Sequence, residues 1–197
     1  RQMCIRDSTT GTGSVDLYVQ GHKVKFGSNI IMDRYIKNGT LPDFDIYGGW
    51  RKPNEQYSDA ANTPTIEINS GQFNKIIMGN GMGTNAVSNL QNTTSNNIMG
   101  SSSASFGGTV TVDYTGKMKQ EDIGLIAGGN EIGTIYSNAI INIKNGNVGK
   151  IIGGNYADSS NRPTSWAYPL NTFIGTSTIN ITGGQIENII GASYGRN

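Results

Sequence analysis

Hydrophobic and polar residues alternate in short runs that recur along the second half of the chain. Three segments align without gaps: 65–80, 140–155 and 178–193. Each opens with a run such as Thr178-Ile-Asn-Ile181, which would place two aliphatic side chains on one face of a strand and polar groups on the other. A turn follows, centred on Gly71, Gly146 or Gly184. A second short strand then carries one apolar residue and an Ile pair. Each segment therefore predicts a strand–turn–strand unit.

A fourth copy of this unit is split by an insertion. Thr109-Val-Thr-Val112 supplies its first strand and residues 123–130 supply the rest, while residues 45–50 and 97–100 carry weaker traces. This alignment predicts two inward columns built from Ile66 and Ile68, Val110 and Val112, Ile141 and Ile143, and Ile179 and Ile181. It also predicts two outward columns, one of Glu67, Thr111, Asn142 and Asn180, the other of Asn69, Asp113, Lys144 and Thr182.

The repeat predicts an all-β fold, a right-handed parallel β-helix. No unit can bury its Ile face alone, so we expect successive units to stack and their strands to pair in parallel at about 4.8 Å. A β-sandwich is the competing fold, but its antiparallel hairpins give no reason for one phrase to recur in one register. We expect degenerate turns with a loop over residues 9–64, and regular repeats with insertions at one corner over 65–197.

The first eight residues form a separate case. Their codons can be written as AGA CAG ATG TGT ATA AGA GAC AGN, which matches the transposon end used in preparing sequencing libraries. We interpret residues 1–8 as an adapter artefact and expect them to pack against nothing. The single cysteine, Cys4, lies in this segment, so we expect no disulfide or thiolate chemistry.

Composition excludes several classes of function. Charged residues make up 15% of the chain, and the net charge is +1, whereas nucleic-acid binding needs concentrated Lys and Arg. No apolar run approaches the roughly 20 residues of a membrane helix. We therefore expect no nucleic-acid partner and no membrane span within this chain, and nothing in it predicts a cofactor.

The repeats carry no evident catalytic or metal site. A β-helix enzyme would place two or three carboxylates on adjacent turns, and neither outward column stacks two acids. Asp43 and Asp45 form the only acidic pair two residues apart; they are few ligands for calcium, and we interpret them as solvated, with Asp45 over Lys75 of the next turn. His22 has no nucleophile or second histidine at an informative spacing, so we interpret it as a surface strand residue. We predict that this chain is not an enzyme.

Phrases such as Asn180-Ile-Thr-Gly-Gly-Gln-Ile-Glu-Asn-Ile-Ile-Gly191 resemble the repeats of adhesin-like bacterial surface proteins with a pectin-lyase fold. The resemblance covers Thr65 to Tyr194 well and Thr9 to Pro64 loosely. It implies an extracellular or cell-surface protein that faces carbohydrate or a host. On that basis we expect a non-catalytic stalk segment that displays loops and binds a polysaccharide or host-surface glycan. The alternative is a fragment of a polysaccharide lyase or glycoside hydrolase whose catalytic turns lie outside this chain.

The insertions carry the candidate ligand-binding residues. Both tryptophans lie in segments that leave the repeat after its Gly-Gly corner, where loops often form a binding edge. The competing interpretation has these aromatic rings folding back over the repeats. The predicted platform consists of Trp50, Trp166 and Tyr168, with Arg51, Asn161 and Arg162 as hydrogen-bond donors.

Overall fold

A computed structural model describes residues 4–7, 15–19, 22–28, 30, 44–49, 65–79, 109–115, 123–131, 135–136, 138–157 and 173–195. Within these ranges the structure is built of strands with no helix. Its strands are β1 (Cys4–Asp7), β2 (Val15–Tyr18), β3 (Lys23–Phe26), β4 (Phe44–Tyr47), β5 (Thr65–Ile68), β6 (Phe73–Ile77), β7 (Thr109–Thr115), β8 (Ile123–Ala127), β9 (Ile135–Tyr136), β10 (Asn138–Asn145), β11 (Asn147–Ile152), β12 (Tyr156–Ala157), β13 (Phe173–Ile174), β14 (Ser177–Ile181), β15 (Gln185–Ile190) and β16 (Tyr194–Gly195). The predicted all-β class is confirmed for this part of the chain.

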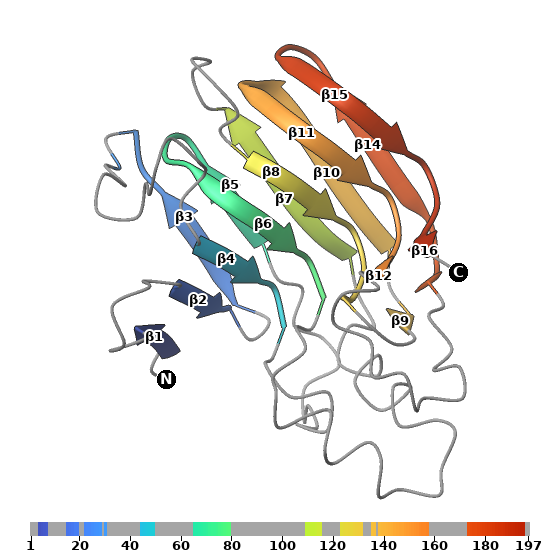
Figure 1. The fold of residues 1–197 in the computed structure, drawn as a ribbon, viewed down its shortest axis with the longest axis horizontal. Coiled ribbons are helices and arrows are strands. Elements are labelled where there is room, and N and C mark those ends of the chain that lie inside the picture. The colour runs from blue at the N-terminus through green and yellow to red at the C-terminus, as the bar shows by residue number, and fades with distance from the viewer. Residues whose placement is uncertain are drawn as a thin grey trace, which may run out of the picture.

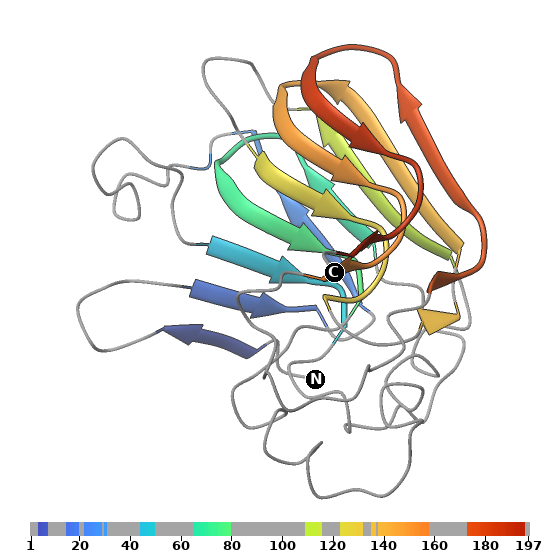
Figure 2. The ribbon, with the colours of Figure 1, turned by 45° about the vertical axis from the view of Figure 1, so that its right-hand side comes forward.

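Two larger sheets organise these strands. One has seven strands in the order β1-β2-β4-β6-β8-β11-β15, and the other has five in the order β14-β10-β7-β5-β3. Four short strands form two further two-stranded sheets, β12-β16 and β13-β9. Apart from these, the chain alternates from β2 onward between the two larger sheets, so that β5 and β6, β10 and β11, or β14 and β15 form one unit (Figure 1). Strands of successive units pair in parallel in both sheets. The two sheets lie face to face, as the turned view in Figure 2 shows.

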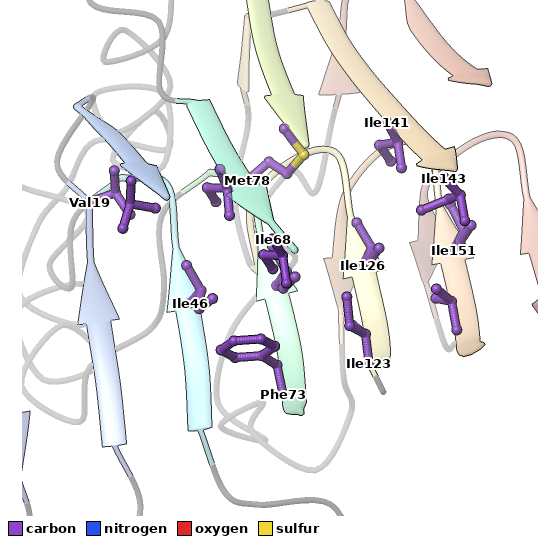
Figure 3. Close-up of a cluster of buried hydrophobic side chains, with 14 of the residues drawn as sticks. Val19, Ile46, Ile68, Phe73, Met78, Ile123, Ile126, Ile141, Ile143 and Ile151 are labelled. Atoms are coloured by element: carbon purple, nitrogen blue, oxygen red, sulfur yellow. The ribbon is translucent and has the colours of Figure 1, made fainter. Parts of the chain in front are cut away.

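The main core fills the space between the two sheets. Its members come from both sheets and include Leu17, Ile46, Ile66, Ile68, Phe73, Ile76, Ile123, Ile126, Ile141, Ile143 and Ile151 (Figure 3). Side chains on a strand alternate between its faces, so the repeated Thr-Ile-Glu-Ile type of run sends both aliphatics inward. In β5 this appears directly, because Ile66 and Ile68 are fully buried while Thr65 and Glu67 are half-buried.

The Ile pair of each unit divides between two clusters. Ile76 and Ile151 point into the main core, while Ile77 and Ile152 join a second apolar cluster on the opposite face of the seven-stranded sheet. That second cluster also contains Tyr18, Tyr47, Leu125 and Ala127, all buried. The seven-stranded sheet is therefore buried on both faces, which is typical of parallel sheets and explains its near-continuous apolar sequence.

Glycine forms the turns between the two strands of a unit, as predicted. Gly71, Gly146 and Gly184 have φ angles of 107°, 100° and 97°. A residue with a Cβ is strained in this left-handed region, and glycine is not. At the other end of the second strand, the backbone pairing between units continues through the corner. The Gly128 amide donates to the carbonyl of Ile152 at 2.9 Å, and the Gly153 amide donates to the carbonyl of Ile190 at 2.8 Å.

Asparagine side chains accept hydrogen bonds from the backbone at the corner. The Asn155 side-chain oxygen accepts a hydrogen bond from the backbone amide of Asn130 in the previous unit (2.8 Å), and both residues are fully buried. In the next unit the Ser193 hydroxyl oxygen replaces it and accepts from the Asn155 amide (3.0 Å). These side chains satisfy buried backbone donors that would otherwise be costly.

The predicted register is wrong at β7. The alignment of the sequence paired Ile66 with Val110, whereas Ile66 lies beside Val112 and Ile68 beside Tyr114. On the other side Val112 pairs with Ile141, and Val110 with Ala139. The displacement is two residues, which preserves the alternation that the sequence predicts because the period of a strand is also two. The remaining columns pair as predicted, with Ile141 beside Ile179 and Ile143 beside Ile181.

The expectation that residues 1–8 pack against nothing is also wrong. Strand β1 pairs with β2 in antiparallel orientation, with Cys4 opposite Tyr18 and Asp7 opposite Val15. It covers the N-terminal edge of the seven-stranded sheet and is the one antiparallel neighbour among the described strands. An edge strand left open would offer unpaired amides and carbonyls to solvent, which gives this segment a reason to pair.

Candidate functional site

The predicted aromatic platform falls outside the described residues. Trp50, Arg51, Asn161, Arg162, Trp166 and Tyr168 all lie there, as does Asp43 of the acidic pair. His22 is described and is exposed just before β3, as its surface interpretation requires. The side chains that the structure does place together lie in two groups, one on the outer face of each large sheet.

The first group surrounds Lys75 on the seven-stranded sheet. Lys75 lies beside Asp45 in register, which confirms the predicted stacking of these two residues on successive units. Its Nζ lies 3.2 Å from Asp45 Oδ2 and 2.8 Å from Glu131 Oε1. Glu131 follows the corner after β8. Lys75 of β6 therefore contacts both β4, which precedes it in the chain, and a segment that follows it.

This charged group is buried, contrary to the solvated interpretation of Asp45. Asp45 is 7% exposed and Glu131 is 3% exposed. The Asn74 side-chain amide donates to Asp45 Oδ1 at 2.8 Å, and the Tyr47 hydroxyl donates to Asp45 Oδ2 at 3.4 Å. A sequence pattern could reveal the pairing of Asp45 with Lys75, but Glu131 has no periodic position, so sequence analysis missed it.

Burial determines the protonation of this group. It raises the pKa of Asp45 to about 6, against the opposing effects of the Lys75 charge and the Asn74 hydrogen bond. Burial alone would lower the pKa of Lys75, but Glu131 and Asp45 together raise it above its ordinary value. Lys75 therefore stays charged, and Asp45 takes up a proton near pH 6.

Two tyrosines border the charged group. The rings of Tyr18 and Tyr47 stack at 4.9 Å with an interplanar angle of 9°, and Lys75 Nζ lies 5.6 Å from the centre of the Tyr47 ring. Burial, with the neighbouring carboxylates, raises the pKa of both hydroxyls well above the ordinary range. Both hydroxyls therefore stay protonated near neutral pH, where each can donate a hydrogen bond, as Tyr47 does to Asp45.

The second group lies on the outer face of the five-stranded sheet. Because of the corrected register at β7, Glu67 lies directly beside Asp113, and the row continues through Asn142 to Asn180. The prediction that no two acids stack on this face is therefore wrong. The cause is the two-residue displacement, which brings Asp113 rather than Thr111 into the column of Glu67.

Lysines of the preceding strand hold Glu67 in its ionised form. Lys25 Nζ lies 2.6 Å from Glu67 Oε1, and Lys23 Nζ lies 3.8 Å from Oε2. The hydrogen bond from Lys25 lowers the pKa of Glu67. At the other end of the row the Asn180 side-chain amide donates to Asn142 Oδ1 at 2.8 Å, so a side-chain hydrogen bond joins two successive units there.

A metal site does not emerge from the residues that the structure describes. Among them, no group of three or more His, Cys, Asp or Glu side chains is arranged to hold an ion. Within the same ranges no helix is long and apolar enough to cross a membrane. Comparison with protein-family models, with curated proteins and with solved structures finds no match to this chain.

Proposed function

We propose that this chain is a segment of a right-handed parallel β-helix, and that it serves as a non-catalytic stalk in a bacterial surface or secreted adhesin-like protein. The observation that supports the proposal most is the constant parallel register of the units, from β4–β6 to β11–β15. A chain that returns to the same sheet in parallel makes a right-handed crossover in about 98% of cases. Each unit adds length in one direction, which suits a spacer.

The buried cluster around Lys75 supports the structural part of the proposal. A charged group that serves chemistry has to reach its substrate, whereas Asp45 and Glu131 are shielded from water. Their ion pairs with Lys75 fix the relative position of β4, β6 and the corner after β8. An internal tie of this kind adds rigidity to a stalk without exposing a reactive group.

The display role assigns ligand binding to the loops, with glycans of a polysaccharide or a host surface as the partners. Aromatic rings such as Trp50, Trp166 and Tyr168 bind the C–H face of a sugar at small rotamer cost. A single shallow platform binds weakly, so many copies along a stalk would raise the overall strength. We therefore propose a location outside the cell or on the bacterial surface.

A glycan array tests the display role. The chain is presented in multimerised form beside a Trp166→Ala variant, since avidity is needed to detect weak binding. We expect the unmodified chain to give signals on particular glycans and the variant to lose them while keeping the same thermal midpoint. Equal signals from the two proteins would rule out the aromatic platform as the glycan-binding site.

One observation favours a second candidate, a polysaccharide-active enzyme. Glu67 and Asp113 lie side by side on adjacent parallel strands, and paired carboxylates are the machinery of many glycoside hydrolases. Against it, the Lys25 contact lowers the pKa of Glu67, whereas a general acid needs a raised one. Incubation with pectin, alginate and chondroitin separates the candidates. New reducing ends or unsaturated products that Glu67→Gln abolishes would establish the enzyme; unchanged polymers favour the stalk.

A further inference from the structure

Lys75 and two buried carboxylates meet in a geometry that suits a covalent reaction between side chains. Lys75 Nζ lies 3.2 Å from Asp45 Oδ2 and 2.8 Å from Glu131 Oε1. The Lys75 and Asp45 side chains are only 17% and 10% exposed, so little bulk water reaches the amine and the carboxyl. Well-oriented groups within one molecule reach effective molarities on the order of 10⁵–10⁸ M, which favours a condensation that separate molecules in water do not undergo.

Strand pairing keeps the amine and the carboxyl in contact. Asp45 of β4 and Lys75 of β6 are partners in the parallel register, on the outer face of the seven-stranded sheet. The next pair in the register, Ile46 and Ile76, is fully buried in the main core. A slip of one residue between these strands would turn both isoleucines out of the core, so the packing fixes the alignment of the charged pair.

Hydrogen bonds and burial make Asp45 the electrophile. The Asn74 side-chain amide donates to Oδ1 at 2.8 Å, where it would stabilise the negative charge that develops during an attack on Cγ. The Tyr47 hydroxyl donates to Oδ2 at 3.4 Å, the oxygen that would leave. Burial raises the pKa of Asp45 to about 6, and the charge of Asp16 on β2 adds to this while Lys75 and Asn74 oppose it. Near that pH a large share of the Asp45 carboxyl groups carry the proton that lets Oδ2 leave as water.

We propose that Lys75 and Asp45 form an intramolecular amide bond, with Glu131 as the group that accepts and returns protons. One proton passes from the Nζ ammonium to the Glu131 carboxylate, and the neutral amine attacks Cγ of Asp45. The Cγ–Oδ2 bond then breaks, and Oδ2 leaves as water with its own proton and a second proton from Nζ. The third ammonium proton stays on the amide nitrogen, so the step needs no oxidant and no cofactor. The inference goes beyond the proposed function and does not depend on it.

Proton transfer to Glu131 sets the rate of this step. Glu131 is nearer to Nζ than Asp45 is, and burial keeps the Tyr18 and Tyr47 hydroxyls protonated, so neither tyrosine competes for the proton. Glu131 and Asp45 together raise the pKa of Lys75, which makes the neutral amine a minor form. The bond therefore forms slowly after folding. The ion pair, and with it the titration of the Asp45 carboxyl, belongs to the state that precedes the bond.

Intact-protein mass spectrometry tests the bond, because the condensation removes one water molecule from the mass of the chain. The full chain is purified under native conditions, and in parallel it is refolded from urea so that a time course at pH 6 begins with free side chains. We expect the mass to fall by one water molecule during incubation. Tryptic digestion should then yield a branched pair of peptides joined through Asp45 and Lys75, without cleavage after Lys75.

Variants separate the roles of the three side chains. Lys75→Arg keeps the positive charge but loses the nucleophilic amine, so it should retain its full mass, as should Asp45→Ala. Glu131→Gln should slow the loss of water at least tenfold, and Glu131→Asp, which keeps a carboxylate, should recover part of the rate. Lys150→Arg is the matched control and should react at the original rate. Lys150 lies in the same outward column of the sheet, but over the ring of Tyr194 at 4.9 Å.

A chain that keeps its full mass, both as purified and after incubation, would overturn the inference. So would a loss of water that persists in Lys75→Arg, because it would come from dehydration elsewhere in the chain. A branch through Glu131 in place of Asp45 would overturn the assignment of the electrophile. An unchanged rate in Glu131→Gln would overturn the role of Glu131 in proton transfer.

Discussion

Replacing Ile143 by alanine tests the core between the two sheets against a matched position in the same column. Ile143 is fully buried and lies between Tyr114 and Ile181 in the five-stranded sheet. Ile181 has a neighbour on one side only among the described strands and is 42% exposed. The two substitutions delete the same atoms from the same face of the same sheet, so their difference measures the covering unit alone.

The expected losses differ by a factor of two or more. Truncating a fully buried isoleucine removes its transfer free energy and leaves a cavity, which together cost about 2–5 kcal/mol. At Ile181 roughly half of the side chain is already in water, so the loss should be about 1 kcal/mol. Asn142→Ala, on the outer face, breaks one exposed hydrogen bond with Asn180 and should cost under about 0.5 kcal/mol.

Urea unfolding followed by circular dichroism measures these free energies of unfolding at fixed pH. The urea midpoint should be highest for Asn142→Ala, lower for Ile181→Ala and lowest for Ile143→Ala. The slope of the free energy of unfolding against urea concentration should be the same for all three variants. For a chain of this length a loss of about 3 kcal/mol corresponds to a drop of roughly 6–12 °C in thermal midpoint. Equal losses at positions 143 and 181 would refute the reasoning, because they would mean that the neighbouring unit does not cover Ile143.

Three further predictions follow from the corners, the charged cluster and the N-terminal edge. Gly128→Ala should destabilise strongly, by more than Gly191→Ala in thermal unfolding, because its methyl group would overlap the carbonyl of Gly153; equal effects would contradict this. The pKa of Asp45 is raised from 3.8 to about 6, so protonation favours the folded state and its stabilisation is lost as pH rises from about 4 to 6. Asp45→Asn should therefore gain stability relative to the unmodified chain over that window, by up to about 3 kcal/mol in urea titrations, and parallel profiles would contradict it. Deleting residues 1–8 should lower the thermal midpoint by a few degrees, since β1 covers the edge of β2; an unchanged midpoint would show that this pairing adds no stability.

The sequence could predict which side chains face inward, but not the pairing of every strand. Alternation in Thr109-Val-Thr-Val112 continues through Tyr114, so two registers that differ by two residues place the same faces inward. The choice between them depends on the neighbours of β7 in both directions, which pair Val112 with Ile66 and Ile141. A repeat pattern contains no such long-range information.

The contacts of the charged residues could likewise be predicted only in part from the sequence. The stacking of Asp45 on Lys75 follows from the repeat, because matching positions of successive units are neighbours. Burial of Asp45 and the approach of Glu131 depend on packing on the outer face of the seven-stranded sheet, where no periodic signal exists. Likewise, Glu67 acquires its acidic neighbour only through the register of β7.

The parallel pairing of successive units also has a mechanical consequence. Hydrogen bonds between β8 and β11, or between β11 and β15, point along the direction in which units stack. A pull along that direction acts on the interfaces between units in series, so each interface carries the whole force. The weakest interface then opens first and the others remain closed, because each unit contacts its neighbours alone. Under tension such a chain lengthens in steps of one unit, and it absorbs work at each step instead of failing at once.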